Sequence, residues 1–168
     1  GVGINFIFAF VLLLFTGLIF GAPSTDPIIN QVEEGYPAYE AGITSGDEVL
    51  SLNGHKITYL EDISLYLAIE DLSKPLTFDV KKPNGDINSY QVVPKKIKDD
   101  EGNDKYAIGI ALKAEVSRGL GKSIKYAFNE ECAIFKQMFV VLGNLFTGGV
   151  KVSQLSGPVG IYSVVGQM

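Results

Sequence analysis

The chain has 168 residues, a net charge of −5 and a single cysteine, and 46% of its residues are hydrophobic. The acidic balance argues against a nucleic-acid partner, which requires a basic face, and one cysteine excludes an internal disulfide bond and a cysteine-based metal cluster. Residues 26–115 hold 17 of the 19 acidic residues, whereas residues 1–25 hold none. This distribution favours an acidic water-soluble domain between two membrane-associated segments.

The first predicted element is a transmembrane helix within residues 1–23. Residues 3–22 are apolar and uncharged, and a helix of about 20 residues spans roughly 30 Å, the thickness of the hydrocarbon layer. A secretory signal peptide is the alternative, but it requires a basic start and a shorter apolar core. Asn5 is the strongly polar residue near the start, and it either faces other helices or lies among the lipid headgroups.

A dense series of turn signals follows. Pro23 and Pro27 end the helix, and residues 28–32 are expected to form a short strand. Residues 36–54 then predict a short helix opened by a proline and closed by a glycine, a Gly-Asp turn, a strand and an Asn-Gly reversal. This order resembles the signature of a PDZ domain of the bacterial protease-associated type.

The remaining pattern completes that domain. We expect a short strand at 56–58, an amphipathic helix at 60–72, a hairpin of strands 76–81 and 87–93, and a final strand at 106–112. Residues 95–105 are charged and lack a periodic apolar face, so they predict an exposed loop. The expected fold class is α+β, a PDZ-like, partly open β-barrel with two helices over residues 24–115, flanked by transmembrane or membrane-associated helices.

Residues 116–150 carry apolar residues at helical spacing with charged residues between them. They predict an amphipathic helix whose charged first half lies along the membrane surface or packs on other helices before the more apolar part enters the membrane. Cys132, within this segment, is expected to be a packed, inert thiol. Residues 151–168 are expected to begin a further membrane segment. Because the chain begins without methionine and ends within an apolar pattern, we expect a piece of a longer protein.

Two end motifs extend the resemblance beyond the PDZ domain. The chain opens with Gly-Val-Gly-Ile-Asn-Phe, which includes Asn5, and residues 156–161 read Ser-Gly-Pro-Val-Gly-Ile, which includes Gly157 and Pro158. Together with the central domain, these motifs are similar to the site-2 protease family of intramembrane zinc metalloproteases, of the regulator-of-sigma-E type. Val2 stands where that family usually has proline.

The resemblance implies a multi-pass protein of the cell membrane with an extracytoplasmic PDZ domain, whose substrates are membrane proteins cleaved by regulated intramembrane proteolysis. Such a protease uses zinc to activate a water molecule, held by a His-Glu-x-x-His motif and a third ligand. Those ligands lie outside this chain in the family. We therefore expect no catalytic residue or metal ligand here, and a chain that is inactive by itself.

PDZ domains bind peptide termini by adding a strand to an exposed sheet edge beside a helix. We expect residues 28–32 to be that edge, with Ile28, Ile29, Ile63 and Leu67 lining the groove. For Ile63 and Leu67 a place in the core is the alternative, and a PDZ domain this close to the bilayer could also act by size exclusion.

Other residues suggest chemistry only weakly. His55 is expected to be a solvated turn residue, because a single imidazole does not make a zinc site. The acidic run at 99–104 lacks the ligand spacing of an EF-hand. The alternative function is a non-catalytic, membrane-tethered PDZ adaptor that binds peptides.

Overall fold

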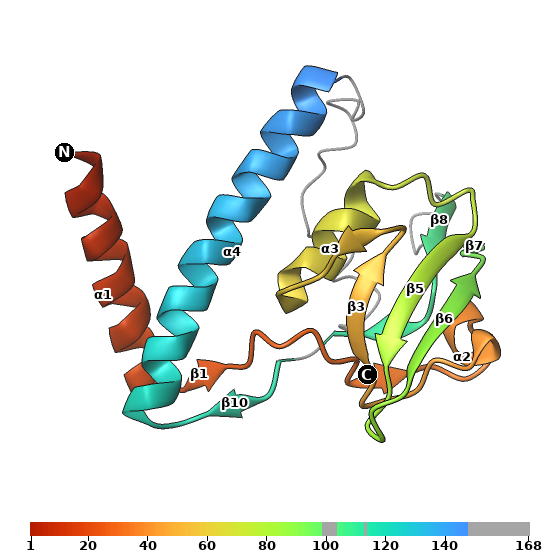
Figure 1. The fold of residues 1–168 in the computed structure, drawn as a ribbon, viewed down its shortest axis with the longest axis horizontal. Helices are drawn as coiled ribbons and strands as arrows, with labels where there is room; N and C mark the ends of the chain where they lie inside the picture. The colour runs from red at the N-terminus through yellow and green to blue at the C-terminus, as the bar shows by residue number, and fades with distance from the viewer. Residues whose placement is uncertain (99–103, 113, 148–168) are drawn as a thin grey trace. The chain divides into compact units, whose positions relative to one another are not determined.

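The computed structural model describes residues 1–98, 104–112 and 114–147. They form two compact units, a helical unit from residues 1–26 and 114–147 and a β-rich unit from the described part of residues 27–112 (Figure 1). The predicted segment 151–168, with Gly157 and Pro158, lies outside the described residues.

Two helices, α1 (Val2–Phe20) and α4 (Leu120–Thr147), make up most of the helical unit. Near the end of α1, Gly17 is buried, and a Cβ placed there would lie 3.2 Å from the Cβ of Ser123. Near its start, the rings of Phe6 and Phe135 lie 4.6 Å apart. The end of α1 thus contacts the start of α4, and the start of α1 contacts a later part of α4. The two helices therefore pack antiparallel (Figure 1).

A short antiparallel strand pair joins the segment that follows α1 to the segment that precedes α4. Strand β1 (Ala22–Pro23) pairs antiparallel with β10 (Val116–Ser117). The Ser24 amide donates to the Glu115 carbonyl at 2.8 Å. Two side-chain contacts continue the junction, from Lys125 to Asp26 at 3.2 Å and from the Asn129 amide to the Thr25 hydroxyl at 2.9 Å.

The β-rich unit contains a four-stranded antiparallel sheet of order β4-β3-β5-β6. Its strands are β3 (Glu48–Leu52), β4 (His55–Lys56), β5 (Leu76–Lys81) and β6 (Ile87–Val92). The Asn-Gly reversal is confirmed, because Asn53 (φ 48°) and Gly54 (φ 80°) both have positive φ between the paired residues Leu52 and His55, as the twist of a two-residue hairpin requires.

The core lies between this sheet and helix α3 (Leu60–Ile69). Alternate residues of β5 point inward, and Leu76, Phe78 and Val80 are each 0% exposed. Ile63 of α3 is also fully buried. The helix ends before the predicted Leu72 because Glu70 has extended backbone angles.

Helix α2 (Pro37–Ala41) begins at the predicted proline. It ends at Gly42, whose φ of 96° is left-handed, a conformation that costs glycine little. The α+β class is thus confirmed for the described residues.

The prediction of an exposed loop at residues 95–105 is wrong. Strands β7 (Lys95–Lys98) and β8 (Asp104–Ala107) pair antiparallel there. The sequence does not indicate these strands, because their side chains are mostly charged and solvent-exposed, and an exposed hairpin needs no apolar face. The predicted strand 106–112 is likewise divided, into β8 and β9 (Ile110–Ala111).

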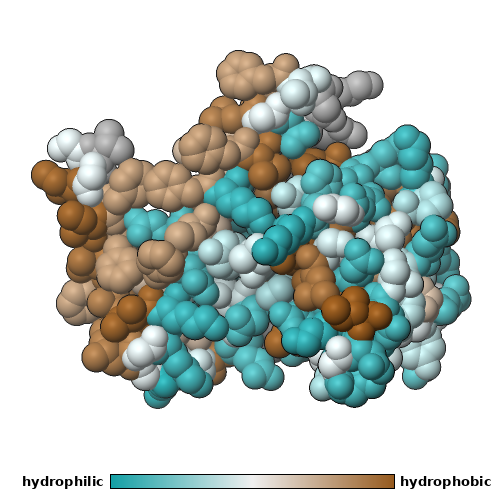
Figure 2. All heavy atoms as spheres, viewed as in Figure 1, coloured by the Kyte–Doolittle hydropathy of each residue, from teal (hydrophilic) through white to brown (hydrophobic). Residues whose placement is uncertain are grey.

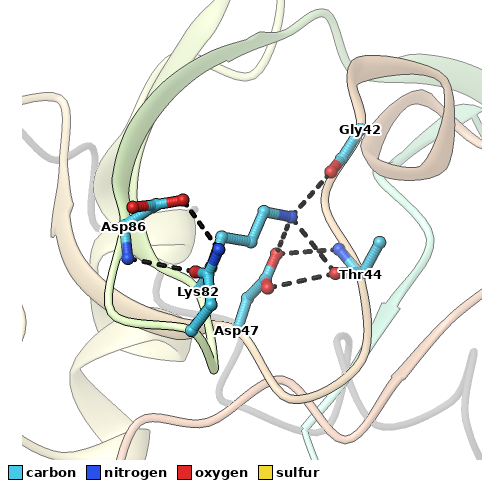
Figure 3. A network of polar contacts seen from close by, with 6 residues as sticks. Gly42, Thr44, Asp47, Lys82 and Asp86 are labelled. Atoms are coloured by element: carbon cyan, nitrogen blue, oxygen red, sulfur yellow. Dashed lines mark hydrogen bonds and ion pairs between the residues drawn. The ribbon is translucent and has the colours of Figure 1, made fainter.

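A buried ion pair ties the turn after α2 to the β5–β6 hairpin (Figure 3). The Lys82 ammonium lies 2.8 Å from the Asp47 carboxylate, which is fully buried, and 2.9 Å from the Gly42 carbonyl. Asp47 also accepts a bond from the Thr44 amide at 2.8 Å. Burial lowers the pKa of Lys82, but interactions with Asp47 and with Tyr90 together outweigh burial, so the pKa is raised from its ordinary value.

Replacing Lys82 with methionine should destabilise the β-rich unit by about 3 kcal/mol, because it leaves the buried Asp47 carboxylate without its cation. Native-state amide exchange of β5 measures this free energy of opening. The matched control is Lys74→Met, which removes an exposed pair with Asp71 and should change the same free energy by less than about 0.5 kcal/mol. Equal effects of the two substitutions would contradict the assigned role of Lys82.

Candidate peptide-binding site

The segment predicted to be an open sheet edge has hydrogen-bond partners on both sides. On one side, the Ile29 amide donates to the Asp47 carbonyl at 2.9 Å, and Ile28 forms an isolated bridge with Glu48. On the other side, β2 (Gln31–Val32) pairs with β9. Residues 28–32 therefore lie between two neighbours, and only the last two form a regular strand.

Strand β9 has the open edge instead. It pairs antiparallel with β2, and the Glu33 amide donates to the Gly109 carbonyl at 2.9 Å while the Asn30 amide donates to the Ala111 carbonyl at 3.2 Å. Backbone groups of successive residues in a strand point to opposite edges, so those of Ile110 and Leu112 point away from β2. Their N–H and C=O groups make no hydrogen bond to another strand among the described residues.

Close packing fixes the entry to β9. Gly109 has φ of +79°, and a Cβ placed on it would lie 2.1 Å from the Cβ of Tyr36. The neighbouring Ile108 carbonyl accepts a bond from the Ala38 amide of α2 at 2.9 Å. Only glycine permits this approach, which sets the path of the chain into the open edge.

The ring of Tyr36 also lies under the Lys95 ammonium, 5.8 Å from it. Lys95 pairs with Ala107, two residues before Gly109. A positive charge therefore lies beside the chain where it enters β9, a suitable environment for an acidic group on a bound peptide.

The residues predicted to line the groove differ in exposure. Ile28 is 44% exposed, whereas Ile29 and Ile63 are 0% exposed and Leu67 is 8% exposed. Three of them are part of the core in this structure: Ile29, Ile63 and Leu67. For Ile63 and Leu67 of α3, a place in the core is the alternative given above. Of the four residues, Ile28 alone has a substantially exposed side chain. Asn5 lies exposed on α1, far along the chain from this domain.

Helix α3 is held at both ends by polar contacts. The Asp62 carboxylate accepts bonds from the Thr58 and Tyr59 amides at 2.8 and 2.9 Å. At the other end, His55 lies 3.4 Å from the Glu70 carboxylate and stacks on the Tyr66 ring at 4.6 Å. His55 is half-exposed, as expected of a residue after a turn, but it has partners that the sequence did not indicate.

The described residues contain no group of three or more His, Cys, Asp or Glu side chains arranged to hold a metal ion. The donor set that a hydrolytic zinc ion needs is therefore not assembled in this part of the chain. His55, with one carboxylate beside it, supplies too few ligands. We assign no catalytic step to the described residues.

Comparison with known proteins identifies the β-rich unit. Residues 28–82 match the family model of the PDZ domain, so this unit has a PDZ-like fold. A solved PDZ domain of an SdrC-like protein from Listeria monocytogenes aligns with 51% of this chain and 84% of its own, with 18% identity and a TM-score of 0.42.

Two curated relatives cover nearly the whole chain. The regulator of sigma-W protease RasP of Bacillus subtilis is 34% identical over 98% of this chain, and the zinc metalloprotease RasP of Bacillus licheniformis is 30% identical over 98%. The resemblance to zinc metalloproteases predicted from the sequence is confirmed. The chain spans 38% of the length of each of these relatives.

Substituting Gly109 with alanine should open the β2–β9 pair, because the new methyl group collides with Tyr36. We expect a loss of more than about 3 kcal/mol, typical of overpacking combined with a strained backbone. Gly85→Ala is the matched control: Gly85 also has positive φ (+94°), but nothing lies within 4 Å of its Cβ position, so the cost should be about 1 kcal/mol. Amide exchange at Glu33 reports the opening, and equal losses would refute the packing argument.

Amide exchange also tests the open edge directly. We expect the amides of Ile110 and Leu112 to exchange at least about 100-fold faster than that of Ala111, because only the latter faces β2. The comparison is internal to one strand, so it needs no variant. Equal protection of the three amides would show that another segment covers this edge.

Proposed function

We propose, from the premise that this chain is homologous to one stretch of bacterial zinc metalloproteases, that it is part of a membrane-embedded zinc protease. In this proposal α1 spans the bilayer and the PDZ domain lies on the extracytoplasmic face. The whole protein cleaves membrane-protein substrates by regulated intramembrane proteolysis. The single observation that carries the proposal is the alignment of 98% of the chain with RasP-type proteins.

The surface of α1 supports a membrane location. Residues Gly3–Phe20 are long and apolar enough to cross a bilayer, and few of them are buried. Large side chains such as Ile7, Phe8 and Phe15 are more than half exposed. In Figure 2 brown and tan apolar atoms cover most of the visible surface of α1, and teal patches interrupt them on α4, whereas teal and white atoms cover most of the β-rich unit. In water each exposed side chain of this kind costs about 1.5–3 kcal/mol relative to burial, and lipid removes that cost.

The PDZ domain supplies substrate selection in this proposal. A peptide terminus of a trimmed substrate adds a strand to β9, whose backbone donors and acceptors are available at Ile110 and Leu112. This places the peptide one strand away from the edge at 28–32 predicted from the sequence. Size filtering by the folded domain is a second way to select substrates and needs no bound peptide.

The zinc chemistry belongs to residues outside this chain. Zinc would polarise the scissile carbonyl and activate water when bound by the whole protein. The contribution of this chain is to anchor, to bind peptide and to limit access.

The second candidate is a membrane-tethered PDZ adaptor without catalysis, supported by the open edge of β9, which can bind a peptide without a zinc ion. The two candidates differ in the adjoining sequence and in metal content. The protease should carry His-Glu-x-x-His in an apolar helix within about 40 residues before Gly1, and the purified full-length protein should contain about one zinc ion per chain by atomic emission. An adjoining sequence without this motif and a metal-free protein would instead support the adaptor.

A further inference from the structure

Helix α4 contacts α1 along most of the length of α1. The contact of Gly17 with Ser123 and that of Phe6 with Phe135 are separated by 11 residues on α1 and 12 on α4. At about 1.5 Å per residue these contacts lie roughly 17 Å apart, more than half of the hydrocarbon thickness. If α1 spans the bilayer, α4 therefore lies at the same depth. This differs from the sequence-based expectation, in which the charged first half lies along the surface.

At 3.6 residues per turn, α4 has a mainly apolar side and an opposite polar side. Part of the apolar side packs on α1, where Ser123 contacts Gly17 and Phe135 contacts Phe6. The rest of that side is apolar and exposed, with Ile124 at 44%, Phe128 at 60% and Met138 at 47%.

The opposite side of α4 is polar. Its members are spaced by three, four and seven positions and so lie along one side of the helix: Lys122, Lys125, Asn129 and Lys136. Lys125 and Asn129 contact the residues that follow α1, Asp26 and Thr25.

A helix that lies at the level of the bilayer and has a polar and an apolar side must have a different environment on each side. Hydrocarbon suits the apolar face, but it accommodates an amide and lysine side chains only at high cost. Near the middle of the shared depth, next to Asn129, lies the half-buried Glu130. Ionisable residues at this depth normally border protein or a water-filled cavity.

We propose that α4 lies beside α1 at the level of the bilayer, with its apolar face toward lipid and its polar face bordering a water-filled space inside the protein. This inference rests on the proposed function, because it takes α1 to be a membrane-spanning helix.

Cysteine cross-linking in the full-length protein tests the shared depth. In a Cys132→Ala background, Phe6→Cys with Phe135→Cys should be joined by a short bis-methanethiosulfonate reagent in native membranes. Phe6→Cys with Ile124→Cys is the matched control and should not be joined, because Ile124 lies near the opposite end of α1. Failure of the first pair, with joining of a Gly17→Cys and Ser123→Cys pair, would place α4 along the surface and overturn the proposal.

Labelling with a charged, membrane-impermeant thiol reagent tests the two faces at one depth. Two neighbouring pairs are compared in the same background: Asn129→Cys with Phe128→Cys, and Lys136→Cys with Met138→Cys. The polar-face cysteine of each pair should react at least 10-fold faster. Equal rates within both pairs would overturn the assignment of faces.

Leu12→Cys on α1 separates the inference from the proposed function. A thiol at this position should stay unlabelled in membranes and react after detergent denaturation. Rapid labelling at Leu12 in intact membranes would reject the membrane-spanning role of α1, and with it both proposals. Protection at Leu12 together with equal labelling of the two faces of α4 would reject the further inference alone.

Discussion

The apolar surface of α1 is the constraint on which this account depends. The helix has no charged residue, and its single contact stripe on α4 leaves side chains such as Ile4, Leu12 and Phe20 exposed. Water would be a poor solvent for such a surface, whereas a bilayer satisfies it while the helix satisfies its own backbone. In the proposed arrangement, the antiparallel contact of α1 with α4 sets the depth of α4, and the paired strands β1 and β10 would lie where both connections leave the membrane.

In the β-rich unit, one strand edge is open although the chain that leads into it is firmly packed. A close contact between Tyr36 and Gly109 and a hydrogen bond from the Ala38 amide to the Ile108 carbonyl hold the chain at the entry to β9. Because these contacts do not use the backbone groups of Ile110, the edge stays open while its support is rigid. A preorganised edge of this kind reduces the entropy lost when a peptide binds.

The elements with strong local signals could be predicted from the sequence. Pro37 and Gly42 bound a helix and Asn53-Gly54 a hairpin, because these residues restrict or permit particular backbone angles. Long-range pairing could not be predicted in this way. Residues 28–32 read as an edge, yet their partners come from residues 46–48 and 110–111. The lysine-rich strand β7 reads as a loop in the sequence, since an exposed hairpin lacks the apolar alternation by which strands are recognised.

Alkaline extraction of membranes from cells that make the full-length protein tests the central claim most directly. High pH releases peripheral proteins but leaves chains with spanning helices in the lipid pellet. We expect the protein to stay in the pellet and to enter the soluble fraction only with detergent. Recovery of the protein in the alkaline supernatant would contradict a membrane-spanning α1 and the protease function built on it.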